Sequence, residues 1–485
     1  MTSNYNINMF SNKLKESIYD NEFYGKIQRI EIENFQQASE NLRSYKIQIA
    51  LMTNLMIRAD TYFFTRILDL PELSNSLDEI TPFTPQEEEI FKGYHPYVYE
   101  FTAESTDYDL RSSLNEYSGQ WIKMRNDDGN TTANDIRIQG TEIFSASPLM
   151  ASGKSIIFNR YSKFDSNCVL LDKIFKKDNL KFFTHNCDQL YNYKKFTDLL
   201  SSSIKQILGT VYSVGLANNI KLELVESTSH SCTILYDIGC THITDILHKK
   251  DVSSNLKSFY TENFDAIVLS HWDFDHIAAI GYYNPTLLYS PNMVWVAPDI
   301  NDINEKKLTI SAVRLACYVA NKSNLYLSHN YNMCLNTKNK FLQLWQGKGT
   351  GAKQATHQNN IGLLIELNHF DYLHIRTNKY KSVVYCSNYN KIHALLTGDV
   401  VFDNIPDNLK NNNLYDLLVT PHHGTNRTIP DINGTGRSAA IVCADKSGTS
   451  EHYPGPDHII GLIRNGFKNI YITGEDSNIY FEMIL

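Results

Sequence analysis

The most constraining feature of the sequence is a run of two histidines and two aspartates within six positions, directly after an apolar segment. Residues 264–269 are short, apolar and partly β-branched, which is typical of a buried strand. His271, Asp273, Asp275 and His276 follow at once, on a loop that this strand would deliver to a sheet edge. Nitrogen and oxygen donors of this density suit Zn, Mn or Fe, and a folded loop could direct them at two adjacent cations. The run therefore predicts a metal site; the alternative is a polar loop that caps the next helix.

Two further motifs lie downstream, each at the end of an apolar segment. Residues 394–400 contain Thr-Gly-Asp, and Asp399 could bridge two cations held by the first loop. Residues 417–425 continue from an apolar stretch into a proline, then His422 and His423, then a glycine. Proline ends a strand because it cannot donate to the ladder, and glycine lets a loop approach a site closely. Thr-Gly-Asp alone is more often a simple turn, but the three motifs in this order predict one metal centre.

The ordered motifs resemble the metallo-β-lactamase superfamily. Within it they are most similar to the hydrolase domain of ComEC-like competence proteins, in which a His-x-Asp-x-Asp-His loop replaces the commoner His-x-His-x-Asp-His. The likeness covers residues 205–485 and includes an Asp-x-Gly turn at Asp237. The metal ligands that the resemblance implies are His271, Asp273, Asp275, His276, Asp399 and one or both of His422 and His423.

A further ligand is expected from a loop before the bridging aspartate, where most members of the superfamily supply a histidine. His357 is the candidate, because it precedes a segment that enters a predicted strand at residues 361–367. ComEC-like domains often carry asparagines at this place instead, so a loop histidine without a metal is an equal alternative. His329 is a weaker rival.

The resemblance implies two divalent metal ions, Zn or Mn, as cofactors. Such ions lower the pKa of a bound water to near neutrality and offset charge on a phosphoryl or carbonyl oxygen. Asp275 or Asp399 could orient the nucleophile, and whichever of His422 and His423 is not a ligand could protonate the leaving group. We therefore take Asp275, Asp399 and His423 as candidate catalytic residues.

The implied function is a phosphodiesterase or nuclease, because ComEC-like domains are nucleases or are presumed to be. A nuclease-like domain joined to an unfamiliar N-terminal module is also the build of many bacterial defence effectors, by analogy. Two alternatives remain: a metallohydrolase of another ester or amide, since the fold hosts many chemistries, and a metal-free interaction module. Clustered Asp and His side chains are costly to desolvate without a compensating cation or partner, which argues against the last.

Charge gives no general support for nucleic-acid binding. The formal net charge is -8, whereas proteins that bind nucleic acid non-specifically normally carry a basic face. Residues 173–196 do mix lysines with aromatic side chains, which suits backbone attraction and base stacking. An ordinary solvated face with its aromatics in the core explains that stretch more simply. Nucleic acid or a small phosphodiester remains the expected substrate.

Length and composition bound the organisation of the chain. Its 485 residues, 42% hydrophobic and 20% charged, predict two or three globular domains. We expect an N-terminal α+β domain of unknown role over residues 1–204, which would bind a substrate or a protein partner, and a hydrolase domain over 205–485. Apolar spacing predicts a long helix over residues 35–68.

The compartment expected from the sequence is the cytoplasm. No apolar run is long enough to span a bilayer, and the polar start lacks the features of a secretory signal. The 8 cysteines contain no C-x-x-C pair and lie mostly in apolar runs, so they are expected to be reduced core thiols.

The second half of the chain alternates strand-like and helical patterns, which predicts an α/β fold. It is expected to form a four-layer αββα sandwich with the metal loops at one edge. The predicted strands cover residues 220–225, 232–236, 266–269, 293–297, 361–367, 394–396, 417–420, 439–443 and 470–472.

Overall fold

The computed structural model divides the chain into two compact units. The N-terminal unit comprises Met1–Leu180 with Glu305–Leu315, and the C-terminal unit comprises Lys181–Asn304 with Ala316–Leu485. The domain boundary at residue 204 remains a prediction. The structure describes residues 22–34, 43–52, 57, 60, 99–105, 112, 114–126, 132, 135–139, 142–144, 155–159, 165–175, 185–186, 204–226, 231–240, 254–256, 258–288, 290–300, 309–322, 324–328, 335–336, 342–348, 360–368, 372–378, 383–386, 391–410, 413–425, 432–444 and 454–484.

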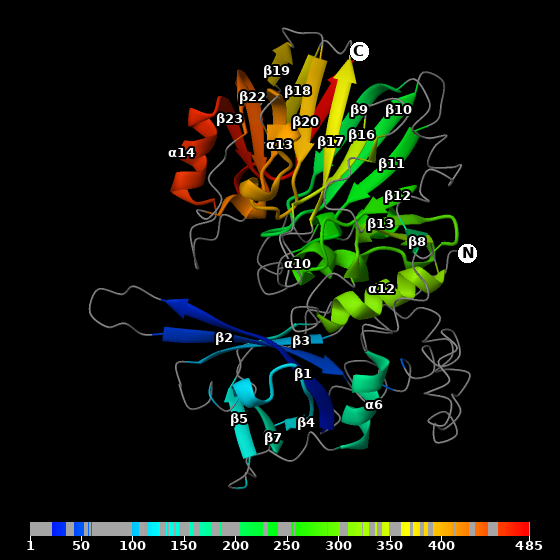
Figure 1. Ribbon diagram of the computed structural model, residues 1–485, viewed down its shortest axis with the longest axis vertical. Coiled ribbons are helices and arrows are strands. Elements are labelled where there is room, and N and C mark those ends of the chain that lie inside the picture. Colours follow the sequence, from blue (N-terminus) through cyan, green and yellow to red (C-terminus); the bar gives the residue numbers. More distant parts are fainter. Residues whose placement is uncertain are drawn as a thin grey trace. The chain divides into compact units, whose positions relative to one another are not determined.

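The described part of the N-terminal unit contains an antiparallel sheet and helix α6 (Ser166–Ile174) (Figure 1). Trp121, Phe158 and Leu171 of α6 are buried in this unit. The helix begins at Asp165, whose carboxylate accepts a hydrogen bond from the Asn167 backbone N–H at 2.9 Å, a normal N-cap. In spatial order the strands are β5 (Asp135–Gln139), β7 (Ser155–Asn159), β4 (Trp121–Asn126), β1 (Glu22–Asn34), β2 (Arg43–Met52), β3 (Tyr99–Ser105) and β6 (Glu142–Phe144).

The long helix expected over residues 35–68 is wrong for residues 43–52. Residues 43–52 form β2, which pairs antiparallel with β1 and β3. Apolar and polar side chains alternate from Lys46 to Ile49, with Ile49 fully buried, and a period of two belongs to a strand. Ladder hydrogen bonds from two neighbouring strands thus outweigh a helical spacing spread over a longer window. Ile57 and Asp60 are helical, as expected.

The C-terminal unit contains two sheets. The first has the spatial order β19 (Val383–Cys386), β18 (Tyr372–Thr377), β24 (Ile479–Ile484), β9 (Ile204–Val211), β10 (Ile220–Glu226), β11 (Ser231–Tyr236), β12 (Ala266–Val268), β13 (Val294–Pro298), β14 (Asn324–Ser328) and β8 (His185–Asn186). The second has the order β15 (Leu335–Asn336), β16 (Leu342–Gln346), β17 (Ile361–Asn368), β20 (Lys391–Leu396), β21 (Tyr415–Val419), β22 (Gly434–Val442) and β23 (Phe467–Ile472). We call them the ten-stranded and the seven-stranded sheet.

One apolar core joins the two sheets face to face. Ile234 and Val268 of the ten-stranded sheet share it with Leu363, Leu396 and Val419 of the seven-stranded sheet. The adjacent residues on those last three strands point the other way, as strand geometry requires. They form a second core with the helices α13 (Asp407–Lys410) and α14 (Pro456–Arg464) (Figure 1). The unit is therefore a mixed α/β structure, and the complete four-layer arrangement remains a prediction.

The nine strands predicted from the sequence of this unit are confirmed, with shifts at their ends. The remaining helical segments, in chain order, are η4 (Phe259–Thr261), α10 (Phe274–Ile277), η5 (Ala278–Tyr282), α11 (Pro285–Leu288), α12 (Ile310–Lys322), η9 (Phe402–Asn404), α13 (Asp407–Lys410), η10 (His422–Gly424), α14 (Pro456–Arg464) and α15 (Thr473–Asp476). None of the helices within the described ranges combines the length and apolar composition needed to cross a bilayer. The five cysteines whose side chains are described are buried, as expected of core residues: Cys168, Cys232, Cys240, Cys317 and Cys443.

Parallel pairing in both sheets explains why distant motifs meet. Strands β11 and β12 run parallel in the ten-stranded sheet, and β20 and β21 run parallel in the seven-stranded sheet. The residues that follow parallel neighbours lie at the same sheet edge. Each sheet therefore gathers its polar turns at one edge, where the chemistry-bearing side chains of both sheets come together.

Candidate metal centre

The first part of the centre is the loop between β12 and α10. His271 and His276 are both fully buried, and their ring centroids lie 3.9 Å apart. Asp273 is the residue before α10, and its Oδ2 lies 3.7 Å from His271 Nε2. Asp275 in the first turn of α10 keeps 38% of its side chain exposed. The loop thus directs two imidazoles inward and leaves one carboxylate open to solvent.

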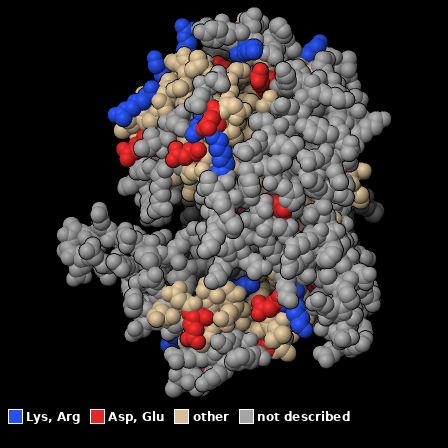
Figure 2. Space-filling model, in the orientation of Figure 1, with Lys and Arg blue, Asp and Glu red and all other residues tan. Residues whose placement is uncertain are grey.

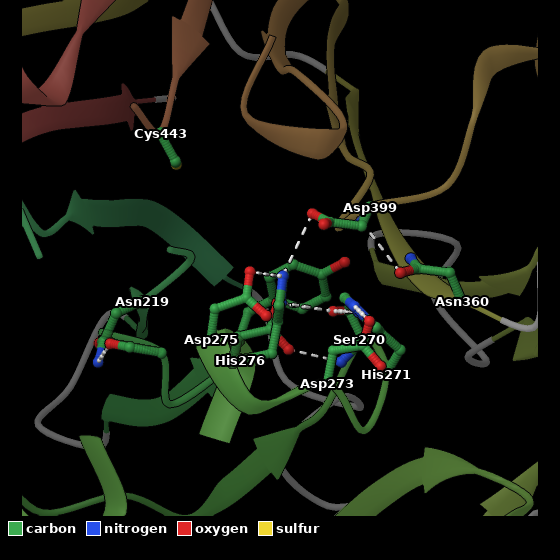
Figure 3. A network of polar contacts seen from close by, with 12 residues as sticks. Asn219, Ser270, His271, Asp273, Asp275, His276, Asn360, Asp399 and Cys443 are labelled. Atoms are coloured by element: carbon green, nitrogen blue, oxygen red, sulfur yellow. Dashed lines mark hydrogen bonds and ion pairs between the residues drawn. The ribbon is translucent and has the colours of Figure 1, made fainter. Parts of the chain in front are cut away.

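The second part comes from the turns after β20 and β21. Asp399 Oδ1 lies 3.2 Å from His276 Nε2, and Asp399 Oδ2 lies 3.6 Å from His423 Nε2. Asp275 Oδ2 lies 3.6 Å from His276 Nε2 and 3.2 Å from His423 Nε2. One ligand atom from each of these four residues lies within 4.8 Å of all the others. In Figure 3, Asp399 approaches His276 and Asp275 from the opposite side of the centre.

His276 is oriented by Asp237, at the end of β11. His276 Nδ1 lies 2.8 Å from Asp237 Oδ2, and both side chains are fully buried. Since an ionised carboxylate only accepts, Nδ1 carries a proton, which leaves Nε2 for a metal ion or a second proton. Nε2 faces Asp399. A carboxylate behind a histidine in this way fixes the tautomer that a metal ion needs.

A backbone carbonyl orients His423 in the same way. Its Nδ1 lies 2.8 Å from the carbonyl oxygen of Cys443, which can only accept a hydrogen bond. The proton therefore sits on Nδ1, and Nε2 is the atom that faces Asp275 and Asp399. Two histidines from different sheets thus present the same nitrogen to the same pair of carboxylates.

The Ser270 hydroxyl joins the two imidazoles of the first loop. It donates to Asp237 Oδ2 at 2.7 Å, so its lone pairs are free to accept. His271 Nδ1 lies 3.0 Å from this oxygen, and His276 Nδ1 lies 3.1 Å away. Donation from His271 Nδ1–H to Ser270 leaves Nε2 of His271 with its lone pair, on the side of Asp273.

Backbone strain concentrates at the centre. Asp237, His422 and His423 have positive φ angles of 60°, 48° and 53°. A non-glycine residue in this region costs roughly 1–3 kcal/mol and persists only where the surroundings require it. At His422 the requirement is visible, because its backbone N–H donates to the carbonyl of Gly398 at 3.1 Å. This bond ties the histidine turn to the turn that carries Asp399.

Without a cation, the centre compensates its own charge. Removal from water would raise the pKa of Asp275, but His276 and His423 outweigh it and lower this pKa to about 2. Likewise His423 and His276 hold the pKa of Asp399 well below its usual range, against the effect of burial. Burial would lower the pKa values of both histidines, yet the carboxylates, Asp399 first, raise them. For Asp237 burial dominates, and its pKa is raised.

The four residues fit a divalent cation. His276 Nε2 and Asp399 Oδ1 are buried, and neither makes a hydrogen bond within the described part of the chain. Two donors bound to one ion at about 2.0–2.2 Å with a tetrahedral angle lie roughly 3.3–3.6 Å apart, close to the separations of 3.2 and 3.6 Å found here. Two imidazole nitrogens with two carboxylates form a donor set that suits Zn or Mn.

The residues predicted from the sequence fall into four groups. Asp275, His276, Asp399 and His423 form the cluster. His271 lies beside it, against the His276 ring, and Asp273 lies next to His271. His422 is outside the cluster, with its ring centroid 6.2 Å from that of His423. His357 and His329 lie outside the described residues.

Three orienting groups were missed by the sequence analysis: Ser270, Asn360 and the Cys443 carbonyl. The sequence signal for Ser270 is its place directly before the first histidine, at a strand end. Asn360, at the entry to β17, accepts a hydrogen bond from the Asp399 backbone N–H at 3.0 Å. A backbone carbonyl leaves no trace in the sequence at all.

Comparison with known proteins adds little to this picture. No protein-family model matches the chain, and no curated protein does. Among solved structures, the chain is similar to a diphosphatase from the PhnP family at 12% identity and a TM-score of 0.27, over 56% of this chain and 87% of that one. It is also similar to a long form RNase Z from yeast at 11% identity and a TM-score of 0.29, over 70% of this chain and 46% of that one. TM-scores this low carry no argument about fold or activity.

Proposed function

We propose that the C-terminal unit is a dinuclear metal-dependent hydrolase that cleaves phosphodiesters, in nucleic acids or in small molecules. The observation that supports it best is the convergence of two imidazole Nε2 atoms on the carboxylates of Asp275 and Asp399. Both imidazoles have their other nitrogen engaged by an acceptor behind them. That arrangement suits cation ligation better than a closed set of ion pairs.

The proposed ligands divide between two ions. Asp275, His276, Asp399 and His423 would hold the first. His271 and Asp273, with Asp399 shared, would hold the second, and His357 remains a proposed additional ligand. His422 is proposed to be free of the metal, because it lies outside the cluster of ligand atoms.

Ions held there would supply a nucleophile at neutral pH and offset negative charge on the phosphoryl oxygens. The chain's own groups would do the rest. The half-exposed Asp275 carboxylate can accept a hydrogen bond from an attacking water and orient it. His422 is part-exposed, and it is close enough to help lower the pKa of Asp399. It is the proposed proton donor to the leaving group.

The phosphodiester preference rests on the resemblance of the three motifs to ComEC-like domains. Surface charge neither adds to it nor opposes it. On the face in Figure 2, the basic and acidic side chains drawn in colour are interspersed, and the described residues form no broad basic surface there. Hydrolysis of another ester or amide therefore remains the alternative activity. We also propose that the N-terminal unit binds the substrate or a protein partner, and the role in bacterial defence stays a hypothesis by analogy.

The test is the metal content per chain, by elemental analysis of protein purified without chelators, compared with Asp399→Asn. The matched control is Asp476→Asn, a buried carboxylate of the same unit that accepts from the Ile472 backbone at 2.9 Å, outside the cluster. We expect close to two ions in the parent and in the control, and a loss in Asp399→Asn. Cleavage of bis(4-nitrophenyl) phosphate, single-stranded DNA and RNA with Mn or Zn should follow the metal content.

Three results would change the proposal. If the parent protein neither contains nor takes up metal, the metal-free interaction module would be the remaining hypothesis. Metal-loaded protein that cleaves carboxylic esters or amides and no phosphodiester would favour the alternative hydrolase. Metal content unchanged in Asp399→Asn would contradict the proposed ligand set.

A further inference from the structure

The two halves of the candidate centre belong to different sheets. His271 to His276 follow β12 of the ten-stranded sheet, whereas Asp399 and His423 follow β20 and β21 of the seven-stranded sheet. The core between the sheets is apolar, and apolar contacts are not directional. The separation of Asp399 and His276 therefore needs a polar connection that sets it.

The backbone at the start of β17 makes one side of that connection. Ile361 N–H donates to the carbonyl of Ser270 at 2.8 Å, next to His271. The hydroxyl of Tyr236, in β11, donates to the carbonyl of Ile361 at 2.8 Å. Thus a strand of the seven-stranded sheet is bonded at this point to two elements of the ten-stranded sheet.

The side chain of Asn360 makes the other part of the connection, to the turn that carries Asp399. It is fully buried, and its Nδ2 donates to the carbonyl of Thr397 at 2.7 Å and to that of Ile361 at 3.1 Å. Its Oδ1 accepts from the backbone N–H of Asp399 at 3.0 Å. Both amide hydrogens and one acceptor position are used, all of them on backbone. Figure 3 shows Asn360 beside Asp399, on the side away from His276.

The turn that Asn360 holds is too tight for other residues. Gly398 has a φ of +57°, and a Cβ there would lie 2.5 Å from Asn360 Nδ2 and 2.6 Å from Ser270 Cβ. The glycine thus packs between the asparagine and the metal loop. An aspartate at position 360 would turn an oxygen toward the Thr397 and Ile361 carbonyls, so the amide is required for its donors.

From these contacts we infer that Asn360 is a positioning residue, which holds the Asp399 carboxylate at ligand distance from His276 and so sets the affinity for the cation. This inference rests on the proposed function. It also gives the loop before the bridging aspartate a different task from that expected of His357. Asn360 acts by orienting a ligand through backbone bonds, without supplying a ligand atom.

The test measures cation affinity in Asn360→Ala and in the milder Asn360→Ser, which keeps one donor. The matched control is Asn478→Ala. Asn478 also makes three hydrogen bonds in the C-terminal unit: its Oδ1 accepts from Ser213 N at 2.8 Å and from Asn255 Nδ2 at 2.7 Å, and its Nδ2 donates to Asn255 Oδ1 at 2.8 Å. Calorimetric titration with Mn²⁺ gives the Kd, the visible spectrum of Co²⁺-loaded protein reports ligand geometry, and thermal unfolding in chelator gives stability.

We expect the Kd to rise roughly 10- to 100-fold in Asn360→Ala, as for other residues that orient metal ligands, and less in Asn360→Ser, with a changed Co²⁺ spectrum in both. Asn478→Ala should lower the Tm and leave Kd and spectrum unchanged. A parent-like Kd and spectrum in either Asn360 variant that folds would overturn this inference and leave the proposed function standing. If Asn360→Ala does not fold, Asn360→Ser alone decides. A parent protein that binds no metal would overturn the proposed function and this inference with it.

Discussion

Two buried clusters of charge, one in each unit, behave in opposite ways. In the N-terminal unit, Arg314 Nη2 lies 2.9 Å from Asp60 Oδ1, and both side chains are at most 3% exposed. Burial outweighs the arginine, and the pKa of Asp60 rises to about 6. In the C-terminal unit, His423 and His276 outweigh burial, and the pKa of the buried Asp399 lies well below its usual range.

The difference lies in how the groups are arranged. Arg314 directs a guanidinium N–H at a carboxylate, which makes a directed donor and acceptor pair. In the candidate metal centre, two imidazole Nε2 atoms converge on the same two carboxylates, so a metal ion could replace the protons that join these atoms. Burial of charge alone therefore does not mark a functional site. What distinguishes the candidate metal centre is that several possible metal ligands converge on one point.

The largest expected effect comes from removing the His276 side chain from the candidate metal centre. His276→Ala leaves the carboxylates of Asp237 and Asp399 buried without the imidazole between them. Such an uncompensated charge costs roughly 3–5 kcal/mol. Urea unfolding of the metal-free variant should show this loss of stability at pH 7. A loss below about 1 kcal/mol would mean that the two carboxylates do not depend on His276.

A somewhat smaller effect concerns pH and the first cluster. The pKa of Asp60 is about 6 in the folded state and about 3.9 in an unfolded chain. Its contribution is fully present below pH 4 and is lost as the pH rises through 6, by roughly 3 kcal/mol in all. Asp60→Asn should remove this part of the pH dependence, measured by urea unfolding between pH 4 and 7. The exposed Glu116→Gln of the same unit is the control, and a parent-like profile in Asp60→Asn would contradict the raised pKa.

The smallest expected effect separates a side-chain partner from a backbone partner within the metal centre. Asp237→Asn should weaken cation binding by roughly 10- to 100-fold, because the acceptor behind His276 Nδ1 changes. Cys443→Ala keeps the carbonyl that accepts from His423, so its metal affinity should remain near the parent value. Titration with Mn²⁺ measures both. Equal losses in the two variants would show that packing, and not the acceptor, orients the histidines.

The fold was predictable where the pattern is local. The strands of the C-terminal unit were found from short β-branched apolar runs between turn signals. In the N-terminal unit the same approach assigned residues 43–52 to a helix, because apolar side chains spaced along a long window satisfy more than one period. Pairing with β1 and β3 makes them a strand, and partners that distant cannot be read from a local pattern.

The candidate site was predictable to the level of residue type and order. His271, Asp273, Asp275 and His276 are within six positions, so any fold that bends this loop brings them together. Which histidine of the pair after Pro421 joins them was left open. Positive φ angles at both residues turn His423 toward the carboxylates and leave His422 outside. Such backbone angles depend on the hydrogen bond to Gly398, which belongs to the tertiary structure.

The sequence by itself therefore determined the chemical nature of the centre, because donor atoms are carried by side chains and the turns that present them are encoded locally. The tertiary structure decided which donors converge and which atom of each imidazole faces the others. Asp237, Asn360 and the Cys443 carbonyl make those choices. Each of them is distant in sequence from the group it orients, so only the pairing of neighbouring strands within each sheet brings them within hydrogen-bonding distance.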